Sequence, residues 1–253
     1  MDTVKSRMHW AVAALAAGMT LAAGSAGAHT TILSQATESV TDDNALKIGH
    51  GCTTTDGSRI PVVAESVVFP TSAPTIATSD GSLVTDLSQV IEQGTFAGLA
   101  RAIQNRSVFR SQQVKADTLG NSIGFSGTQG ALNIDTPGRI PFQFTSPKFV
   151  ATSCAKRVLV QIAIADVCIF GSGVTDSVKA GKVNLWIPDN GSQYAVLGKA
   201  QNIDGIGAPA TLTINRNVTA NPLPASCGAG IDVTITPSAA DITANLPIPG
   251  VWP

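Results

Sequence analysis

Short apolar segments rich in valine, isoleucine and threonine recur along this chain and limit its choice of fold. Turn sequences such as Asp56-Gly57, Pro137-Gly138 and Asp204-Gly205 separate them. The segments that we expect to form strands are 30–33, 59–69, 139–144, 157–170, 183–187, 194–197, 210–214 and 231–235. Repeated short strands divided by turns predict an all-β protein with an immunoglobulin-like β-sandwich fold.

One short helix is expected in an insertion within this sandwich, over residues 83–93. Apolar side chains there recur on one helical face, and Asp80 or Ser82 offers an N-cap. The insertion is expected to continue as strands through residue 126. The proline-rich tail, 245–253, is unsuited to regular structure and forms either a disordered end or an arm packed through Trp252. The β-sandwich domain is therefore expected to span residues 29–244.

The first 28 residues have the pattern of a secretory signal peptide. Lys5 and Arg7 give a charged start, an apolar run follows over residues 10–23, and Ala26-Gly27-Ala28 offers small residues at a cleavage site. The apolar run is shorter than the roughly 20 residues of a membrane-spanning helix. We therefore expect residues 1–28 to be removed and a periplasmic or secreted protein without a membrane span to remain.

Cleavage after Ala28 makes His29 the first residue of the mature chain. A free α-amine and an imidazole Nδ1 on one residue chelate a metal ion together, in the arrangement called a histidine brace. The amine titrates near pH 8, so a cation displaces its proton at neutral pH. Two nitrogen ligands of this kind suit Cu(II) best among the common divalent ions. The position of His29 therefore indicates a copper site.

His50 is the one other histidine after the predicted cleavage site, and its sequence context leaves two interpretations open. In the first it is a further copper ligand or a partner of one. In the second it is a turn histidine that hydrogen-bonds to the backbone, since Gly49 and Gly51 flank it and Cys52 follows.

Cysteine content and charge narrow the class of protein. The four cysteines all follow the leader: Cys52, Cys154, Cys168 and Cys227. An even number in an exported chain predicts two disulfides, with three possible pairings. Charged residues form only 13% of the chain, are scattered and give a net charge of −1. This distribution argues against a nucleic-acid partner, which requires a basic patch.

Together, these motifs resemble the YcnI-like copper-binding family. The matching features are His29 at the cleavage site, then His50-Gly51-Cys52, then Val67-Val68-Phe69-Pro70. A further similarity is the stretch 161–168, which ends at a cysteine and is followed by Leu185-Trp186-Ile187-Pro188. The resemblance covers about half of the mature chain in separate pieces. It implies a β-sandwich that binds Cu(II) through its first residue, a carboxylate and a nearby tryptophan.

Trp186 corresponds to that tryptophan. By strand alternation its ring points away from the side of Leu185 and Ile187, so if those two face the core, Trp186 faces outward and needs a metal or a covering segment beside it. In another interpretation Trp186 is simply a packed core residue.

The carboxylate has no clear counterpart in the sequence. The glutamates Glu38, Glu65 and Glu92 do not lie where the family ligand is expected, and Asp166 and Asp189 are closer to the cysteine-tryptophan stretch. Asp189 is the aspartate that we include among the metal-site residues, with His29, His50 and Trp186, although it also suits an ordinary Asp-Asn-Gly turn.

The resemblance further implies one disulfide between Cys52 and Cys168, which leaves Cys154 to pair with Cys227.

The expected function is therefore non-catalytic: an exported protein that acquires, stores or delivers Cu(II), with a copper-donating or copper-accepting protein as partner. A structural or adhesive surface subunit is the first alternative, because serine- and threonine-rich strands of low charge suit strand-exchange assemblies. A copper-dependent oxidative enzyme is the second, since such enzymes also begin with histidine. The low aromatic content, 5%, disfavours the flat aromatic face that they present to a polymer.

Overall fold

The computed structural model describes residues 29–253, and the expected leader, residues 1–28, lies outside them. Its strands are β1 (Thr31–Ile32), β2 (Ala36–Thr37), β3 (Thr41–Ile48), β4 (Cys52–Thr53), β5 (Arg59–Ile60), β6 (Ala64–Val68), β7 (Thr75–Thr78), β8 (Ala100–Ala102), β9 (Phe109–Ala116), β10 (Ser122–Gly130), β11 (Gly138–Thr145), β12 (Ala155–Val167), β13 (Val183–Trp186), β14 (Ala210–Asn215) and β15 (Ile231–Thr236). The helical elements in this range are η1 (Leu87–Gln89), α1 (Val174–Ser177), α2 (Gln193–Ala200), η2 (Ala225–Cys227) and α3 (Ala239–Asn245).

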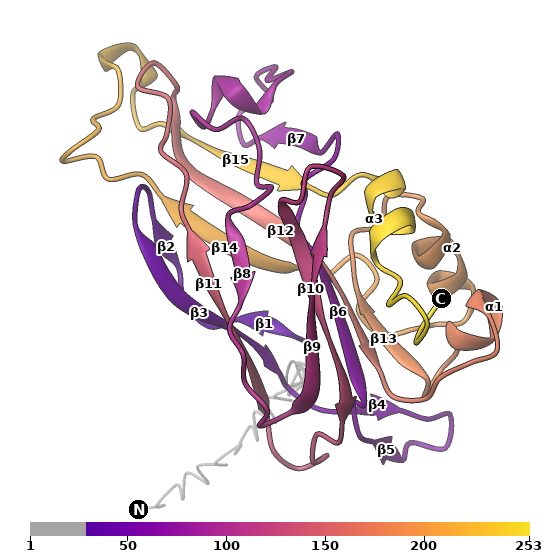
Figure 1. Ribbon diagram of the computed structural model, residues 1–253. Coiled ribbons are helices and arrows are strands. Elements are labelled where there is room, and N and C mark those ends of the chain that lie inside the picture. The colour runs from indigo at the N-terminus through magenta and orange to yellow at the C-terminus, as the bar shows by residue number, and fades with distance from the viewer. Residues whose placement is uncertain (1–28) are drawn as a thin grey trace, which may run out of the picture.

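Two sheets pack face to face (Figure 1). The smaller sheet has the strand order β1-β3-β11-β8, and the larger has the order β2-β14-β12-β6-β10-β9, with β13, β15 and β7 attached through β12 and β15. Phenylalanine rings meet between the sheets, with Phe142 of β11 6.0 Å from Phe69 and 5.9 Å from Phe125 between ring centroids. The chain is an immunoglobulin-like β-sandwich, as the sequence predicts.

Strand β12 connects the two halves of the larger sheet. Its first part, up to Ile162, pairs with β14 and β15, and its last part, from Ala163, pairs with β6 and β13. The segment 157–170, expected to form strand structure, lies largely within this element. β12 is a single strand of 13 residues, and its final residues carry the candidate site described below.

Both faces of the larger sheet are covered, so buried residues occur on both sides of β12 and β13. One face packs against the smaller sheet and includes Trp186, while the other packs against the helical side and includes Leu185 and Ile187. Figure 1 shows α1, α2 and α3 on that second side. Strand alternation correctly separates Trp186 from its neighbours, yet its ring is fully buried rather than turned to solvent.

The prediction of a helix over residues 83–93 is wrong, because only the three-residue 3-10 helix η1 forms there. Asp86, rather than Asp80 or Ser82, caps it by accepting a hydrogen bond from the backbone N–H of Ser88. Leu83, part of the expected apolar face, is 86% exposed. The other apolar residues of that face, Leu87, Val90 and Ile91, are buried in the core without a longer helix. Ile91 forms a β-bridge with Phe149, and the backbone N–H of Val150 donates to the carbonyl oxygen of Val90, so this segment pairs with the one around Phe149 where a helix was expected. The strands expected between residues 94 and 126 do form, as β8, β9 and β10.

Residues 194–197, expected as a strand, lie instead in helix α2. Ser192 is the N-cap, and its side chain accepts a hydrogen bond from the backbone N–H of Ala195. The helix buries Tyr194 and Ala195 against the larger sheet. The preceding turn and the N-cap serine are start signals for a helix that outweigh the short apolar run.

The proline-rich tail is a packed arm rather than a disordered end. The ring of Trp252, 1% exposed, stacks on Tyr194 of α2 with 5.2 Å between centroids. Lys115 of β9 donates hydrogen bonds from Nζ to the carbonyl oxygens of Leu246, at 3.1 Å, and Pro247, at 2.8 Å. These contacts hold the end of the chain over the helical side of the sheet.

Two disulfides, Cys52–Cys168 and Cys154–Cys227, lie next to opposite ends of β12. Both pairings agree with those implied by the YcnI-like resemblance.

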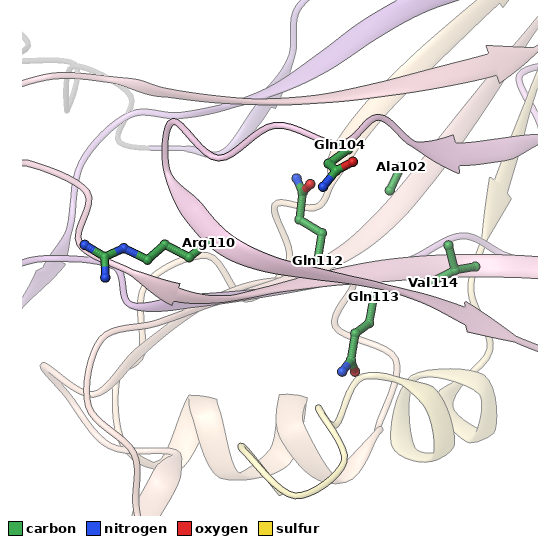
Figure 2. Close-up of a pocket in the computed structure, with 6 residues that line it drawn as sticks. All are labelled: Ala102, Gln104, Arg110, Gln112, Gln113 and Val114. Atoms are coloured by element: carbon green, nitrogen blue, oxygen red, sulfur yellow. The ribbon is translucent and has the colours of Figure 1, made fainter.

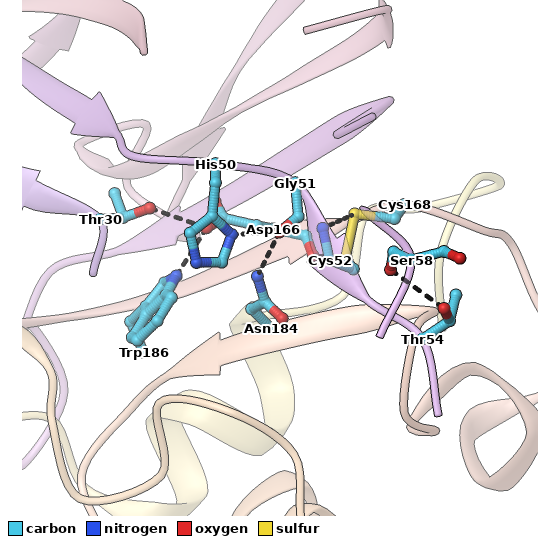
Figure 3. The surroundings of a disulfide bond; sticks show 10 residues. All are labelled: Thr30, His50, Gly51, Cys52, Thr54, Ser58, Asp166, Cys168, Asn184 and Trp186. Carbon is cyan, nitrogen blue, oxygen red and sulfur yellow. Dashed lines mark hydrogen bonds between the residues drawn. A yellow bond between two sulfur atoms is a disulfide. The ribbon is translucent and has the colours of Figure 1, made fainter. Parts of the chain in front are cut away.

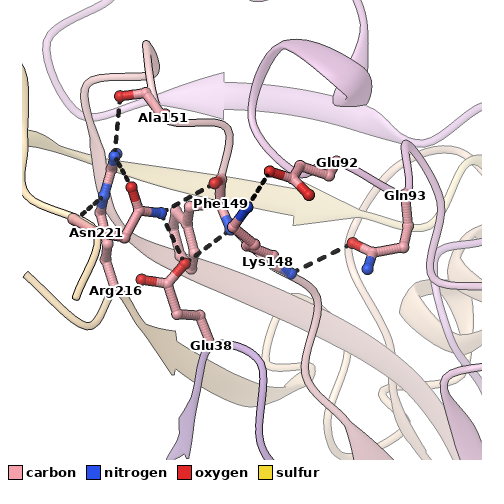
Figure 4. Close-up of polar contacts among 8 residues, drawn as sticks. All are labelled: Glu38, Glu92, Gln93, Lys148, Phe149, Ala151, Arg216 and Asn221. Atoms are coloured by element: carbon pink, nitrogen blue, oxygen red, sulfur yellow. Dashed lines mark hydrogen bonds and ion pairs between the residues drawn. The ribbon is translucent and has the colours of Figure 1, made fainter.

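A buried ionic network lies near the Ala155 end of β12. Both oxygens of Glu38 accept hydrogen bonds. Oε1 accepts from the backbone N–H of Asn217, and Oε2 accepts from the backbone N–H of Phe149 and from the Asn221 side chain (Figure 4). The guanidinium of Arg216 donates to the side-chain oxygen of Asn221 and to five backbone carbonyls, those of Ala151, Ser153, Ala155, Asn221 and Pro222. Each charge is buried together with its partners, as a structural role requires.

Candidate metal site

His29 lies immediately before β1, against the indole of Trp186. The two ring centroids are 4.8 Å apart with the planes tilted by 42°. His29 is partly exposed, and it lines a groove of about 240 Å³ with residues 30–32 and 208–211. The structure thus brings together two of the residues expected in the site, His29 and Trp186, and His29 lies at an open groove.

Asp166 connects the start of the domain to Trp186. Its Oδ2 accepts hydrogen bonds from Oγ1 of Thr30, at 2.7 Å, and from Nε1 of Trp186, at 2.6 Å (Figure 3). Thr30 and Asp166 are both buried, although Thr30 directly follows the partly exposed His29. A buried carboxylate that accepts two donors fixes their relative positions, so Asp166 holds His29 over the indole through the neighbouring Thr30.

Glu65 of β6 is the directly opposed neighbour of Asp166 on β12. Asn184 of β13 opposes Asp166 on the other side. Directly opposed residues point to the same face of a sheet, so the three polar side chains form one row on the face that packs against the smaller sheet. Two carboxyl groups buried side by side in an apolar core are rare without a partner or a bound ion.

Three oxygens of this carboxyl pair have no hydrogen-bond partner among the described residues: both oxygens of Glu65 and Oδ1 of Asp166. Both residues are 0% exposed. Leaving such groups unpaired costs stability, and the structure thus keeps acceptor oxygens available beside Trp186.

Burial changes the acidity of both groups. It raises the pKa of Asp166 to about 6, although the hydrogen bonds from Thr30 and Trp186 and the charge of a protonated His50 act in the opposite direction. Burial, with a smaller contribution from the charge of Asp166, raises the pKa of Glu65 well above its usual value of 4.5. A bound cation is the kind of partner that would favour the ionised form of both carboxyl groups.

His50 lies in the loop that follows β3, next to the carboxyl pair. Its Nδ1 contacts the carbonyl oxygen of Gly51, which leaves Nε2 for another partner. Gly51 must be glycine, since a Cβ there would lie 1.8 Å from the backbone oxygen of Ile60. The disulfide from Cys52 to Cys168 fastens this loop to the end of β12, two residues beyond Asp166 (Figure 3). Both interpretations of His50 stay open.

Asp189 is not brought into this cluster. It forms an ion pair with Lys199 of α2, with 2.8 Å between Oδ2 and Nζ, and both side chains are largely exposed. Asp166 was the other aspartate close in sequence to the cysteine-tryptophan stretch. It is Asp166, rather than Asp189, that contacts Thr30 and Trp186 in the candidate site.

Glu65 and Thr30 belong to the site and were not expected there. Glu65 does not lie at the sequence position where the family resemblance predicts the carboxylate ligand. The available signal was a carboxylate inside the apolar run of β6, between Ala64 and Val67, because a charged residue in a fully buried strand requires a specific partner. Thr30 offered no comparable signal.

Over residues 29–253, no group of three or more histidine, cysteine, aspartate or glutamate side chains has the arrangement of a metal site. Both nitrogen donors of the expected histidine brace, the α-amine and Nδ1, belong to His29. The α-amine becomes free only after the peptide bond between Ala28 and His29 is cleaved. In the same range, no helix is both long and apolar enough to cross a membrane.

No family model and no curated protein matches the chain. Among solved structures, an uncharacterized protein from Nocardia farcinica, described as having an immunoglobulin-like fold, is similar to it at 12% identity. The match covers 75% of this chain and 99% of that one, with a TM-score of 0.37. The resemblance to YcnI-like copper-binding proteins stays a prediction from the sequence.

Proposed function

We propose that this chain is an exported Cu(II)-binding protein that acquires, stores or delivers copper through His29. The observation that carries the proposal is the position of the His29 ring, 4.8 Å from Trp186, whose indole N–H donates to the buried Asp166, as does the hydroxyl of the neighbouring Thr30. Copper here is cargo, and the protein's task is to bind it reversibly.

The donor types in this region suit Cu(II). In the proposal, the α-amine and Nδ1 of His29 are the first two ligands. Oδ1 of Asp166 is the proposed carboxylate ligand, because Asp166 is hydrogen-bonded to Thr30, the residue after His29, and its Oδ1 has no hydrogen-bond partner among the described residues. Nitrogen and oxygen ligands in a tetragonal arrangement are typical of Cu(II) sites. Glu65 supplies a second negative charge beside Asp166, which offsets the charge of the ion.

Exchange of copper with another protein requires access, and the groove beside His29 provides it. A chain terminus at the surface lets a partner approach from outside without unfolding the sandwich. The proposed partner is therefore a copper-donating or copper-accepting protein that reaches His29 from this groove.

The two disulfides are compatible with a periplasmic or extracellular location, because they persist in oxidising compartments. Export also provides the cleavage that the brace requires, so location and metal binding are parts of one proposal.

The test is a Cu(II) titration of two forms of the protein that both begin at His29, one with a free α-amine and one whose α-amine is acetylated. We expect about one Cu(II) per chain in the first form and at least about a hundredfold weaker binding in the second, which lacks the amine ligand. Equal affinity in the two forms would refute the brace.

Two variants test whether residues other than His29 contribute to copper binding. Asp189→Asn is the control and should bind copper normally, because Asp189 pairs with Lys199 away from His29. His50→Ala decides between the two interpretations of His50. Weakened copper binding by a folded variant identifies His50 as a ligand, and normal copper binding identifies it as a backbone-anchored loop residue.

Self-assembly that is unaffected by chelators and also occurs without His29 would favour the structural-subunit alternative instead.

A further inference from the structure

Strand β9 has a free edge on the opposite border of the larger sheet from β2 and β14. It pairs with β10 over eight residues, and within residues 29–253 no other strand pairs with it. An edge strand presents alternate backbone N–H and C=O groups that have no strand partner, and an extended peptide can use them.

A groove runs along this edge. It has a volume of about 180 Å³ and is lined by residues of β8, β9 and the segment between them (Figure 2). Gln104 and Gln112 turn toward each other there, and Arg110 extends outward from the start of the strand (Figure 2). Amide and guanidinium groups beside a free backbone edge offer hydrogen bonds to both the main chain and the side chains of a peptide.

The charge of this region has one sign. Residues 93–116 contain Arg101, Arg106, Arg110 and Lys115 and no aspartate or glutamate. The three arginines are exposed, and none forms an ion pair within the described part of the chain. Lys115 is turned inward to the tail carbonyls. In a protein of net charge −1, this is a local concentration of unpaired positive charge.

We propose that the free edge of β9 binds an extended acidic segment of a partner protein by strand addition. The unpaired backbone groups supply the main-chain pairing, and the arginines select acidic side chains by charge complementarity. A second copy of this chain is a poor occupant, since its edge carries the same arginines and like charges repel across paired strands. The proposal does not depend on copper.

The test uses the copper-free protein that begins at His29 and an end-blocked peptide of alternating glutamate and threonine, twelve residues long. The probe of binding is amide hydrogen exchange followed by NMR. We expect exchange to slow at every second residue of β9, because only alternate N–H groups point away from β10. The same peptide with lysine in place of glutamate should give no such protection.

Charge reversal provides the second measurement. Arg106→Glu with Arg110→Glu should weaken binding of the acidic peptide by about tenfold or more. Arg139→Glu, an exposed arginine of β11 outside residues 93–116, is the matched control and should bind nearly as the unmodified protein does. Both proteins must give the unmodified circular dichroism spectrum.

Three results would overturn the proposal: no protection in β9, equal protection by the lysine peptide, or equal affinity in the Arg106/Arg110 and Arg139 variants. Dextran sulfate separates a peptide site from a general polyanion site. If it competes with the peptide and itself protects the same alternate amides, strand addition is wrong, because a sulfated sugar has no peptide backbone to pair.

Discussion

Buried carboxyl groups near the two ends of β12 differ in whether their oxygens are hydrogen-bonded. Near Ala155, both oxygens of Glu38 are hydrogen-bonded and the charge lies close to Arg216. Near Val167, Glu65 has no hydrogen-bond partner among the described residues and Asp166 has one unpaired oxygen. A disulfide lies beside each end. The comparison separates a buried charge that supports the fold from a buried carboxyl pair whose oxygens are largely unpaired.

The largest expected effect tests whether the two disulfides differ in function. Replacing either pair by serine should lower the free energy of unfolding by about 4–5 kcal/mol, since loop closure depends only on the logarithm of loop size and the separations are 116 and 73 residues. Copper affinity should fall only with Cys52→Ser and Cys168→Ser, because this disulfide is anchored two residues beyond Asp166 at the end of β12.

This prediction is checked by urea unfolding, and by copper titration at a temperature where circular dichroism shows both variants folded. Loss of copper from the Cys154→Ser and Cys227→Ser protein as well would mean that the two ends are not functionally distinct.

The next largest effect is expected near the Ala155 end of β12, where both oxygens of Glu38 are hydrogen-bonded. Glu38→Gln should lower the unfolding free energy by about 2–3 kcal/mol, because an amide NH₂ is placed against N–H donors and the buried Arg216 loses the nearby negative charge. Copper affinity should not change. Denaturant unfolding with a copper titration measures both, and an unaltered unfolding midpoint would contradict the structural role of Glu38.

Thr30→Val tests the connection between Asp166 and His29. The substitution keeps the shape of the side chain and removes the donor to Oδ2, with an expected loss of about 1–2 kcal/mol in unfolding free energy. Because Trp186 shares the same acceptor, the fluorescence of the metal-free protein should also shift, and copper affinity should fall. Thr31→Val, at an exposed position, is the control; identical spectra and affinities for the two variants would dismiss the connection.

Glu65→Gln should have the smallest effect, of the opposite sign. Burial raises the pKa of Glu65, so the folded protein holds a proton that the unfolded chain releases above about pH 4.3. The stability of the unmodified protein therefore falls as the pH rises from there toward the folded-state pKa. Glutamine does not titrate, and the variant should be more stable by on the order of 1 kcal/mol at pH 7, with the difference vanishing near pH 4.

Thermal unfolding at the two pH values checks this. A variant less stable than the unmodified protein at pH 7 would show that Glu65 has a stabilising partner.

Sequence reasoning reached the fold because strands and turns are local signals. The β-branched runs located β6, β11 and β14, and the even number of cysteines in an exported chain indicated two disulfides. It failed where tertiary contacts decide: Val90 and Ile91 are buried beside the segment around Phe149 rather than on a helix, and the apolar run at 194–197 follows a helix N-cap.

Part of the candidate site could be predicted from the sequence. The position of His29 after a cleavage motif and the cysteine-tryptophan stretch pointed to residues that the structure brings together, His29 and Trp186. The carboxylates were misjudged because sequence distance is uninformative in a sheet: Glu65 and Asp166 are 101 residues apart (166 − 65) and directly opposed on neighbouring strands. Pairing of β6 with β12 is a long-range event that no local pattern specifies.

Electron paramagnetic resonance of the Cu(II)-loaded protein tests copper binding at His29 most directly. For the form that begins at His29, the spectrum should be that of a single tetragonal Cu(II) with nitrogen hyperfine coupling, and it should be lost or replaced in His29→Ala at the same copper loading. An identical spectrum in His29→Ala would place the metal elsewhere and contradict the account.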